Sequence, residues 1–139
     1  MTGRAFVDSN VLVYAHDSGA GERHHIAREL VLKLWRDRAG VISTQVLQEV
    51  YVNLRKKASR PLSSTEARDL ISDYLVWNVV VNDGASVVEA IRFEERYNIS
   101  FWDALIVAAA NASAAEVLLT EDLNHGQQYG TVTVRNPFR

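Results

Sequence analysis

Short apolar runs alternate with longer segments of helical spacing along this chain. Residues 22–38 carry apolar side chains at helical spacing, and a second helix is predicted from about Thr44 towards Arg60. Residues 131–134 alternate between polar and apolar side chains, which predicts a fifth strand at the edge of the sheet. Four shorter apolar runs are typical of buried strands: residues 5–7, 41–42, 79–81 and 117–119.

Local signals predict where several helices begin or end. Gly40 follows the first long helix and is expected to end it, as glycine often does. Ser63 with Glu66, and Ser86 with Glu89, have the spacing of capping boxes, so a helix is expected to begin at each serine. No repeat, low-complexity segment or linker separates these elements.

Strands that alternate with helices in this way predict an α/β protein. We expect a mostly parallel sheet of four to five strands with helices on both faces. With 139 residues, the chain is expected to fold as a single domain spanning residues 1–139. Ligands of such sheets bind beyond the carboxyl ends of the strands, so the side chains at that edge are the first candidates for a functional site.

Composition narrows the class of protein. Hydrophobic residues make up 47% of the chain and charged residues 23%, which is typical of a soluble, globular protein. There is no cysteine, which excludes disulfides and thiolate metal sites and favours a reducing, cytoplasmic location. The longest apolar region, residues 104–119, is too short and too polar to span a membrane.

Net charge limits how the protein can bind nucleic acid. The formal net charge of −2 argues against a nucleic-acid-binding protein that relies mainly on a basic surface. It does not exclude one that reaches phosphate through bound divalent cations, because those cations are missing from the count.

Four acidic residues follow strands or lie on helices that come after them: Asp8, Glu49, Asp103 and Asp122. A parallel sheet would carry all of them to one edge. At an effective dielectric constant of ~20, two ionised carboxylates ~5 Å apart repel each other by about 3 kcal/mol. A fold keeps such a cluster when a cation, a proton or a reaction compensates it, which points to Mg²⁺ or Mn²⁺ and phosphate chemistry.

Each acid also has a simpler interpretation, which the sequence leaves open. Asp8 has the position of a helix cap, and Asp103 the spacing of a capping-box acid after Ser100. Asp122 would suit an Asx turn. For Glu49 the simpler interpretation is an ion pair on the helix surface. It is the weakest of the four, because no Lys or Arg stands three or four residues further along the helix.

Two basic residues, Lys56 and Arg60, are candidates for contacts with a nucleic-acid backbone. They lie seven and eleven residues after Glu49, hence on the same face if the helix continues that far. The alternative is that cations are favoured near any helix C-terminus by the helix dipole.

Four segments, each containing one of the acids, carry a family resemblance: AFVDSNVLVY at residues 5–14, ISTQ at 42–45 with the acid at 49, FWDALI at 101–106 and LTEDL at 119–123. With these segments in order, and with Asn136-Pro137-Phe138 near the end, the chain resembles the PIN-domain ribonucleases and, among them, the VapC-type toxins of toxin–antitoxin pairs. The resemblance covers nearly the whole chain.

The resemblance implies a three-layer α/β/α sandwich and an endoribonuclease that depends on Mg²⁺ or Mn²⁺. It also implies RNA as substrate, a cognate antitoxin as partner and a homodimer. Asp8, Glu49, Asp103 and Asp122 are implied as catalytic and metal-binding acids, with Asn10 and Thr120 as the polar residues that orient them. Asp122 is favoured over Glu121, because the family's last acid stands two residues after a threonine.

Other functions fit the residues less well. A phosphatase with Asp8 as nucleophile usually has a second acid two residues on, where Asn10 stands here. A receiver-type module needs a lysine near its end, but the last lysine of this chain is Lys57. The remaining alternative is a metal- or phosphate-binding regulatory or partner-binding module without catalysis.

Overall fold

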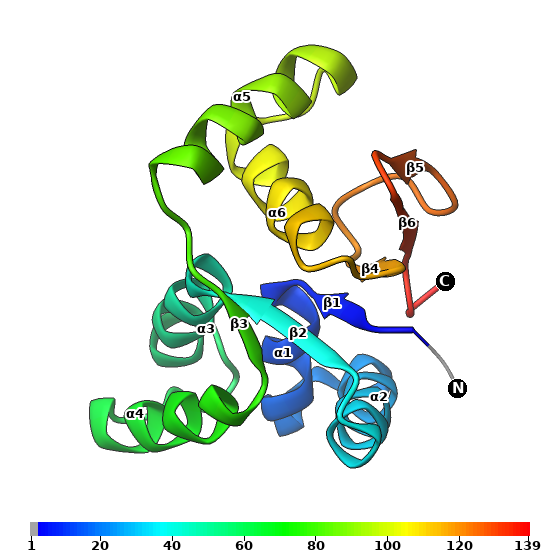
Figure 1. The fold of residues 1–139 in the computed structure, drawn as a ribbon. Helices are drawn as coiled ribbons and strands as arrows, with labels where there is room; N and C mark the ends of the chain where they lie inside the picture. Colours follow the sequence, from blue (N-terminus) through cyan, green and yellow to red (C-terminus); the bar gives the residue numbers. More distant parts are fainter. Residues whose placement is uncertain (1–2) are drawn as a thin grey trace.

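The computed structural model describes residues 3–139 and contains a six-stranded sheet at its centre (Figure 1). The strand order is β3-β2-β1-β4-β6-β5, and every neighbouring pair is parallel except β5 with β6. The strands are β1 (Ala5–Val7), β2 (Gly40–Ser43), β3 (Asn78–Val80), β4 (Val117–Leu119), β5 (Gln128–Tyr129) and β6 (Val132–Arg135).

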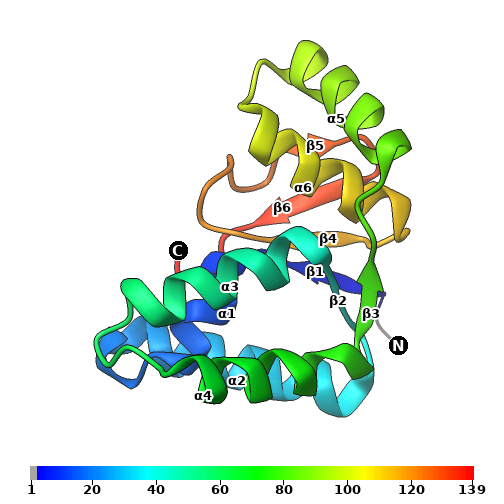
Figure 2. The ribbon, with the colours of Figure 1, turned by 90° about the vertical axis from the view of Figure 1, so that its left-hand side faces the viewer.

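Six α-helices flank this sheet in the described part of the chain: α1 (Ser9–His16), α2 (Glu22–Asp37), α3 (Thr44–Lys56), α4 (Ser64–Asp73), α5 (Gly84–Tyr97) and α6 (Phe101–Ala112). Two 3₁₀ turns, η1 (Ser18–Ala20) and η2 (Tyr74–Val76), complete the set. In both views α5 and α6 lie together on one side and α1 to α4 on the other (Figures 1 and 2). The predicted α/β class, with a mostly parallel sheet between helices, is confirmed.

The sheet differs from the prediction at one edge. The strand predicted over residues 131–134 forms β6, but it pairs in parallel with β4 and is not an edge strand. The edge strand is β5, which pairs with β6 in the antiparallel direction. Only two residues long, β5 is too short to give a periodic signal; it is held because Tyr129 is buried against Tyr97.

Two helix ends also differ from the prediction. The capping box at the start of α5 is formed by Asp83 with Ser86, and not by Ser86 with Glu89. The helix therefore begins at Gly84. The second difference is the end of α3. The helix was predicted to run towards Arg60 but ends at Lys56, because the chain folds back after it. The predicted capping box of Ser63 with Glu66 is present at the start of α4.

The first turns of α5 carry exposed apolar side chains. Val87, Val88 and Ile91 follow the cap, and each of these side chains is between 42% and 54% exposed. They therefore do not belong to the core of this chain.

Register brings the carboxyl ends of the central strands together. Val7 of β1 lies opposite Leu119 of β4, and the backbone N–H of Asp8 donates to the Leu119 carbonyl at 3.0 Å. On the other side of β4, the backbone N–H of Thr120 donates to the Arg135 carbonyl at 3.2 Å. The residues just after β1 and β4 thus emerge side by side at one edge of the sheet.

Across the described residues, none of the helices combines the length and the apolar character needed to cross a membrane.

Gly40 does not end a helix, as its position suggested, but begins β2. The left-handed residue that ends α2 is Arg38, at φ 53°. Gly40 is required for a different reason: a Cβ atom there would overlap the ring of Trp77. That ring packs edge-to-face against Trp35 and Tyr74, so it has little room to move.

We expect Gly40→Ala to lower the free energy of unfolding by about 1–3 kcal/mol, because the added methyl group overpacks the aromatic cluster around Trp77. Gly84→Ala is the matched control, since a Cβ atom there would meet no atom within 4 Å. Chemical denaturation of both variants measures the effect. Equal stability of the two would contradict the close packing of Gly40.

Candidate active site

A pocket of about 460 Å³ lies beyond the carboxyl ends of β1 and β4. The four predicted acids all line it, although they come from four separate parts of the fold: Asp8 follows β1, Glu49 lies on α3, Asp103 on α6 and Asp122 after β4. Across residues 3–139, none of the four forms an ion pair with a basic side chain within 4 Å. The fold therefore gathers these carboxylates without neutralising them.

Asp8 is the most buried of the acids, with 4% of its surface exposed. One carboxylate oxygen accepts a hydrogen bond from the backbone N–H of Ser9 at 2.7 Å, and the other accepts from the Thr120 hydroxyl at 2.8 Å. The pKa of Asp8 is raised to about 7: burial is the largest cause, the hydrogen bonds from Thr120 and Ser9 oppose the rise, and the charges of Glu49 and Asp122 add to it. Asp8 is thus both the cap of α1 and a carboxyl group held at high energy when charged.

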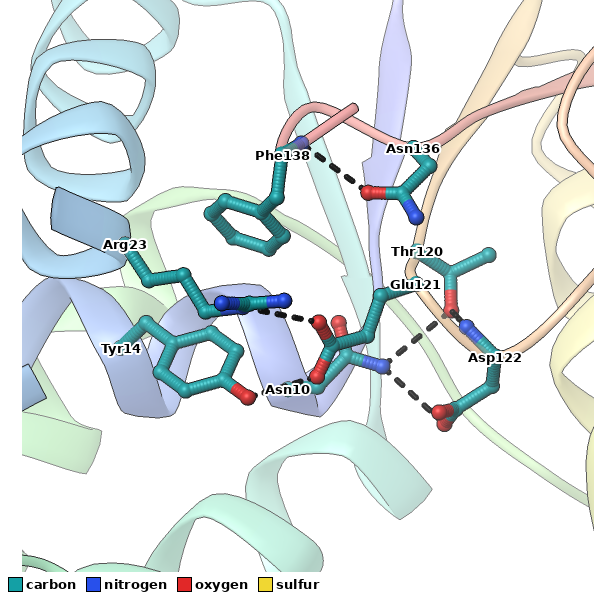
Figure 3. Close-up of polar contacts among 8 residues, drawn as sticks. All are labelled: Asn10, Tyr14, Arg23, Thr120, Glu121, Asp122, Asn136 and Phe138. Carbon is teal, nitrogen blue, oxygen red and sulfur yellow. Dashed lines mark hydrogen bonds and ion pairs between the residues drawn. The ribbon is translucent and has the colours of Figure 1, made fainter.

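Asn10 and Thr120 connect Asp8 to Asp122; Figure 3 shows their contacts with Asp122. The Asn10 amide donates to the Thr120 hydroxyl oxygen at 3.2 Å and to the Asp122 carboxylate at 3.0 Å. The same Thr120 oxygen accepts from the backbone N–H of Asp122 at 3.1 Å. These neutral donors fix two carboxylates relative to each other without adding a positive charge to the pocket.

Glu49 is held by two residues that the sequence did not nominate. The Ser9 hydroxyl donates to one of its oxygens at 3.0 Å, and the Gln45 amide donates to the other at 3.4 Å. Gln45 is buried and also donates to the Trp102 carbonyl at 3.3 Å, which joins α3 to α6. The four-residue spacing of Gln45 and Glu49 on one helix is the signal that would have identified it.

Asp103 lines the pocket and stands in the first turn of α6, but the predicted capping box is incomplete: Ser100 caps the helix without the reciprocal hydrogen bond from the Ser100 backbone to the Asp103 carboxylate. The Asp103 backbone N–H donates to the Ser100 hydroxyl at 3.1 Å, so the residue takes part in the cap of α6. Its carboxylate lines the pocket, and burial raises the pKa of Asp103; a hydrogen bond between the Asp103 and Ser100 side chains opposes this rise, and the Asp122 charge adds to it.

Glu121 points away from this group. Its carboxylate accepts from the Tyr14 hydroxyl at 2.6 Å and pairs with Arg23 at 3.3 Å (Figure 3). Unlike Asp122, it is not one of the residues that line the pocket. The two neighbouring acids are therefore separated by geometry, one facing the pocket and the other facing α1 and α2.

The pocket has the chemistry of a site for a hydrated divalent cation. Its charged groups are mostly carboxylates, which suit Mg²⁺ and Mn²⁺. The side-chain oxygens of Asn10 and Gln45 are buried there without a hydrogen-bond donor, and water molecules around a cation would supply one. Within residues 3–139 no three acidic or histidine side chains are close enough to form a complete ligand set. This fits a cation held by one or two carboxylates and otherwise by water, as is usual for Mg²⁺.

The basic candidates are arranged differently from the prediction. Neither Lys56 nor Arg60 lines the pocket, and Arg60 lies beyond the end of α3 and not on its face. Lys57, the residue that caps α3, lines the pocket instead. It follows Gln45, Glu49 and Asn53 along one side of the helix at four-residue intervals, so a polar stripe leads from the acids to a positive charge.

Without a metal ion, Asp8→Asn is expected to stabilise the protein above about pH 7. In the folded protein the Asp8 pKa is about 7, against 3.8 for a free side chain. The folded state therefore binds more protons between these values, and its stability falls as pH rises from about 4 to about 7. The asparagine variant lacks this loss, which amounts to about 4 kcal/mol at most.

Thermal unfolding in EDTA measures this effect. The melting temperature of Asp8→Asn should exceed that of the unchanged protein at pH 8, and the difference should shrink towards pH 4. A difference independent of pH would show that Asp8 is not destabilised by its burial.

The chain resembles known proteins in family and in fold. The family model of the PIN domain matches residues 5–129. A search of curated proteins found no significant match.

Solved structures share the fold at low sequence identity. A toxin–antitoxin complex from Klebsiella pneumoniae is 24% identical, with a TM-score of 0.67, 96% of this chain covered and 97% of that chain. VapC20 of Mycobacterium tuberculosis, a toxin that cleaves the sarcin–ricin loop, is 18% identical, with a TM-score of 0.63 and coverage of 82% and 86%. VapBC2 of Rickettsia felis, bound to promoter DNA, is 16% identical, with a TM-score of 0.65 and coverage of 95% and 97%. The extent of the family match, over an acidic pocket at the expected edge of the sheet, shows that this chain belongs to the PIN-domain family.

Proposed function

We propose that this protein is a metal-dependent endoribonuclease that hydrolyses phosphodiester bonds of RNA. One observation carries the proposal: four carboxylates from separate elements line one pocket, and none of them is paired with a cation among the described residues. Such an arrangement is costly unless a bound cation or a reaction uses it. Membership of the PIN-domain family supports RNA as the substrate.

In this proposal Asp8 and Asp103 hold the cation, Mg²⁺ or Mn²⁺, directly. Glu49 and Asp122 hold it through water or position the attacking water molecule. When bound, the cation would lower the pKa of that water and stabilise negative charge on the phosphate. Asn10 and Thr120 keep Asp8 and Asp122 in place through the contacts already described, so that neither carboxylate can turn away to relieve the repulsion.

In the cell, the protein would act as a VapC-type toxin in the cytoplasm. It would bind a cognate antitoxin and form a homodimer. Similarity to the toxin structures from Klebsiella, Mycobacterium and Rickettsia supports it.

Two apolar surfaces would serve these assemblies. Val87, Val88 and Ile91 of α5 are exposed and would suit the contact between two copies. Between α3 and α4, an apolar hollow lined by Leu47, Tyr51 and other residues would suit a segment of the antitoxin.

A module that binds metal or phosphate without catalysis is the alternative. It would use the same pocket and the same acids, so only cleavage of RNA separates the two functions.

Purified protein is expected to cleave RNA in the presence of Mn²⁺ or Mg²⁺ and to lose this activity in EDTA. Asp8→Asn and Asp103→Asn should each lower the rate by more than about 100-fold, because each removes a carboxylate proposed to hold the cation. Asp37→Asn is the control, since Asp37 forms an exposed pair with Lys33 on α2. Folded protein that binds metal and leaves a range of RNAs intact would favour the alternative.

The polar stripe on α3 leads to a second prediction. Lys57→Gln is expected to raise KM for RNA several-fold with little change in kcat, because the lysine would bind a phosphate beside the scissile one. The slope of log kcat/KM against log salt concentration should become shallower by about 1, the contribution of one phosphate contact. Lys56→Gln and Arg60→Gln should have smaller effects, because those side chains would reach only the outer part of the RNA.

Lys33→Gln on α2 is the control for this comparison, since it removes one positive charge far from α3 in sequence. If Lys57→Gln changes KM no more than Lys33→Gln does, the RNA does not follow the polar stripe.

A further inference from the structure

Glu121 is tied into a cluster that joins four separate parts of the chain. Its carboxylate accepts from Tyr14 of α1 at 2.6 Å and pairs with Arg23 of α2 at 3.3 Å. The Arg23 guanidinium lies 5.8 Å from the centre of the Tyr14 ring and 5.5 Å from that of Phe138, near the chain end. The two rings meet edge-to-face at 5.2 Å. We call these four residues the clamp; Figure 3 shows them together.

The clamp holds the loop that carries Asp122. Thr120 and Asp122 contact Asp8 and Asn10 at the pocket, whereas Glu121 between them contacts Arg23 of α2 and Tyr14 of α1, a residue that also lines the pocket. The three residues are consecutive, so the contacts that fix Glu121 also restrain the backbone on which Thr120 and Asp122 stand.

The chain end secures the same loop at a second point. The backbone N–H of Asn136 donates to His125 at 3.0 Å, and the Asn136 side chain accepts from the backbone N–H of Phe138 at 2.9 Å. Phe138 is thereby placed against Tyr14 and Arg23. The loop is thus held between the clamp and the chain end, while its exposed carboxylate, Asp122, faces the pocket.

The contacts of Glu121 also balance its charge. A further unpaired carboxylate beside the pocket would add to the repulsion among the acids, but Arg23 offsets the charge of Glu121. The short hydrogen bond from Tyr14 fixes the direction of the carboxylate, which an exposed ion pair alone would not do.

We propose that Glu121 is a positioning residue: through Tyr14, Arg23 and Phe138 it sets Asp122 and Thr120 against Asp8, and so determines how tightly the pocket binds a divalent cation. This inference rests on the proposed function, because it assigns the pocket to a cation. It gives Glu121 no contact with the cation or with RNA.

The experiment is titration of the metal-free full chain with Mn²⁺, followed by electron paramagnetic resonance of free Mn²⁺. Tyr14→Phe and Glu121→Ala are expected to raise the Mn²⁺ dissociation constant about tenfold, as the loss of a hydrogen bond to a charged group would. Glu121→Gln should bind Mn²⁺ more tightly than Glu121→Ala does, because its amide oxygen still accepts from Tyr14. Phe138→Ala should also weaken Mn²⁺ binding, because it removes the contacts of the chain end with Tyr14 and Arg23.

Asp37→Asn is the matched control, since it removes an exposed ion pair on α2 away from the pocket. It should leave the dissociation constant unchanged. Thermal unfolding in EDTA separates a change in metal binding from a loss of structure, and Tyr14→Phe removes only one hydroxyl group if Glu121→Ala fails to fold.

Three results would overturn parts of this account in distinguishable ways. If the unchanged protein binds Mn²⁺ and all clamp variants bind it equally well, the clamp only stabilises the fold and the inference is wrong. If Glu121→Gln and Glu121→Ala lose affinity equally, the carboxylate does not act through Tyr14. If the unchanged protein does not bind Mn²⁺, both the inference and the proposed metal-dependent function fail.

Discussion

Repulsion among carboxylates at one edge of the sheet is the constraint on which the rest of the site depends. Parallel pairing of β1 with β4 places Asp8 beside Thr120, and this register cannot slip without moving the buried side chains of both strands. Burial and neighbouring charge hold the pKa of Asp8 at about 7, so the charged form is disfavoured in the absence of a cation. The protein keeps this destabilising group in a buried position, which is typical of a site maintained for function.

Neutral hydrogen-bond donors hold the acids in place. Asn10, Thr120, Ser9 and Gln45 fix the carboxylates without adding charge, whereas a lysine or arginine would have cancelled the field that attracts a cation. Arg23 pairs with Glu121, an acid that does not line the pocket. Among the described residues, Lys57 is the one basic residue that lines the pocket, against five carboxylates.

Much of this structure could be predicted from the sequence, for identifiable reasons. The alternation of apolar runs and helical spacing was sufficient for the α/β class, and the position of each acid after a strand or on the following helix placed it at the correct edge. The edge strand β5 escaped prediction because two residues carry no period, and Arg60 was misplaced because the end of α3 depends on tertiary folding. Lys57 and Gln45 were not predicted to line the pocket, because the side of α3 that faces it was not defined by the acids alone.

The most direct test of the account is anomalous diffraction from crystals soaked in Mn²⁺. The account predicts an anomalous peak in the pocket, bordered by Asp8 and Asp103, with water between the ion and the Glu49 or Asp122 carboxylate. A pocket without a peak at millimolar Mn²⁺, or a peak only at surface carboxylates elsewhere, would contradict the claim that this cluster of acids exists to bind a cation.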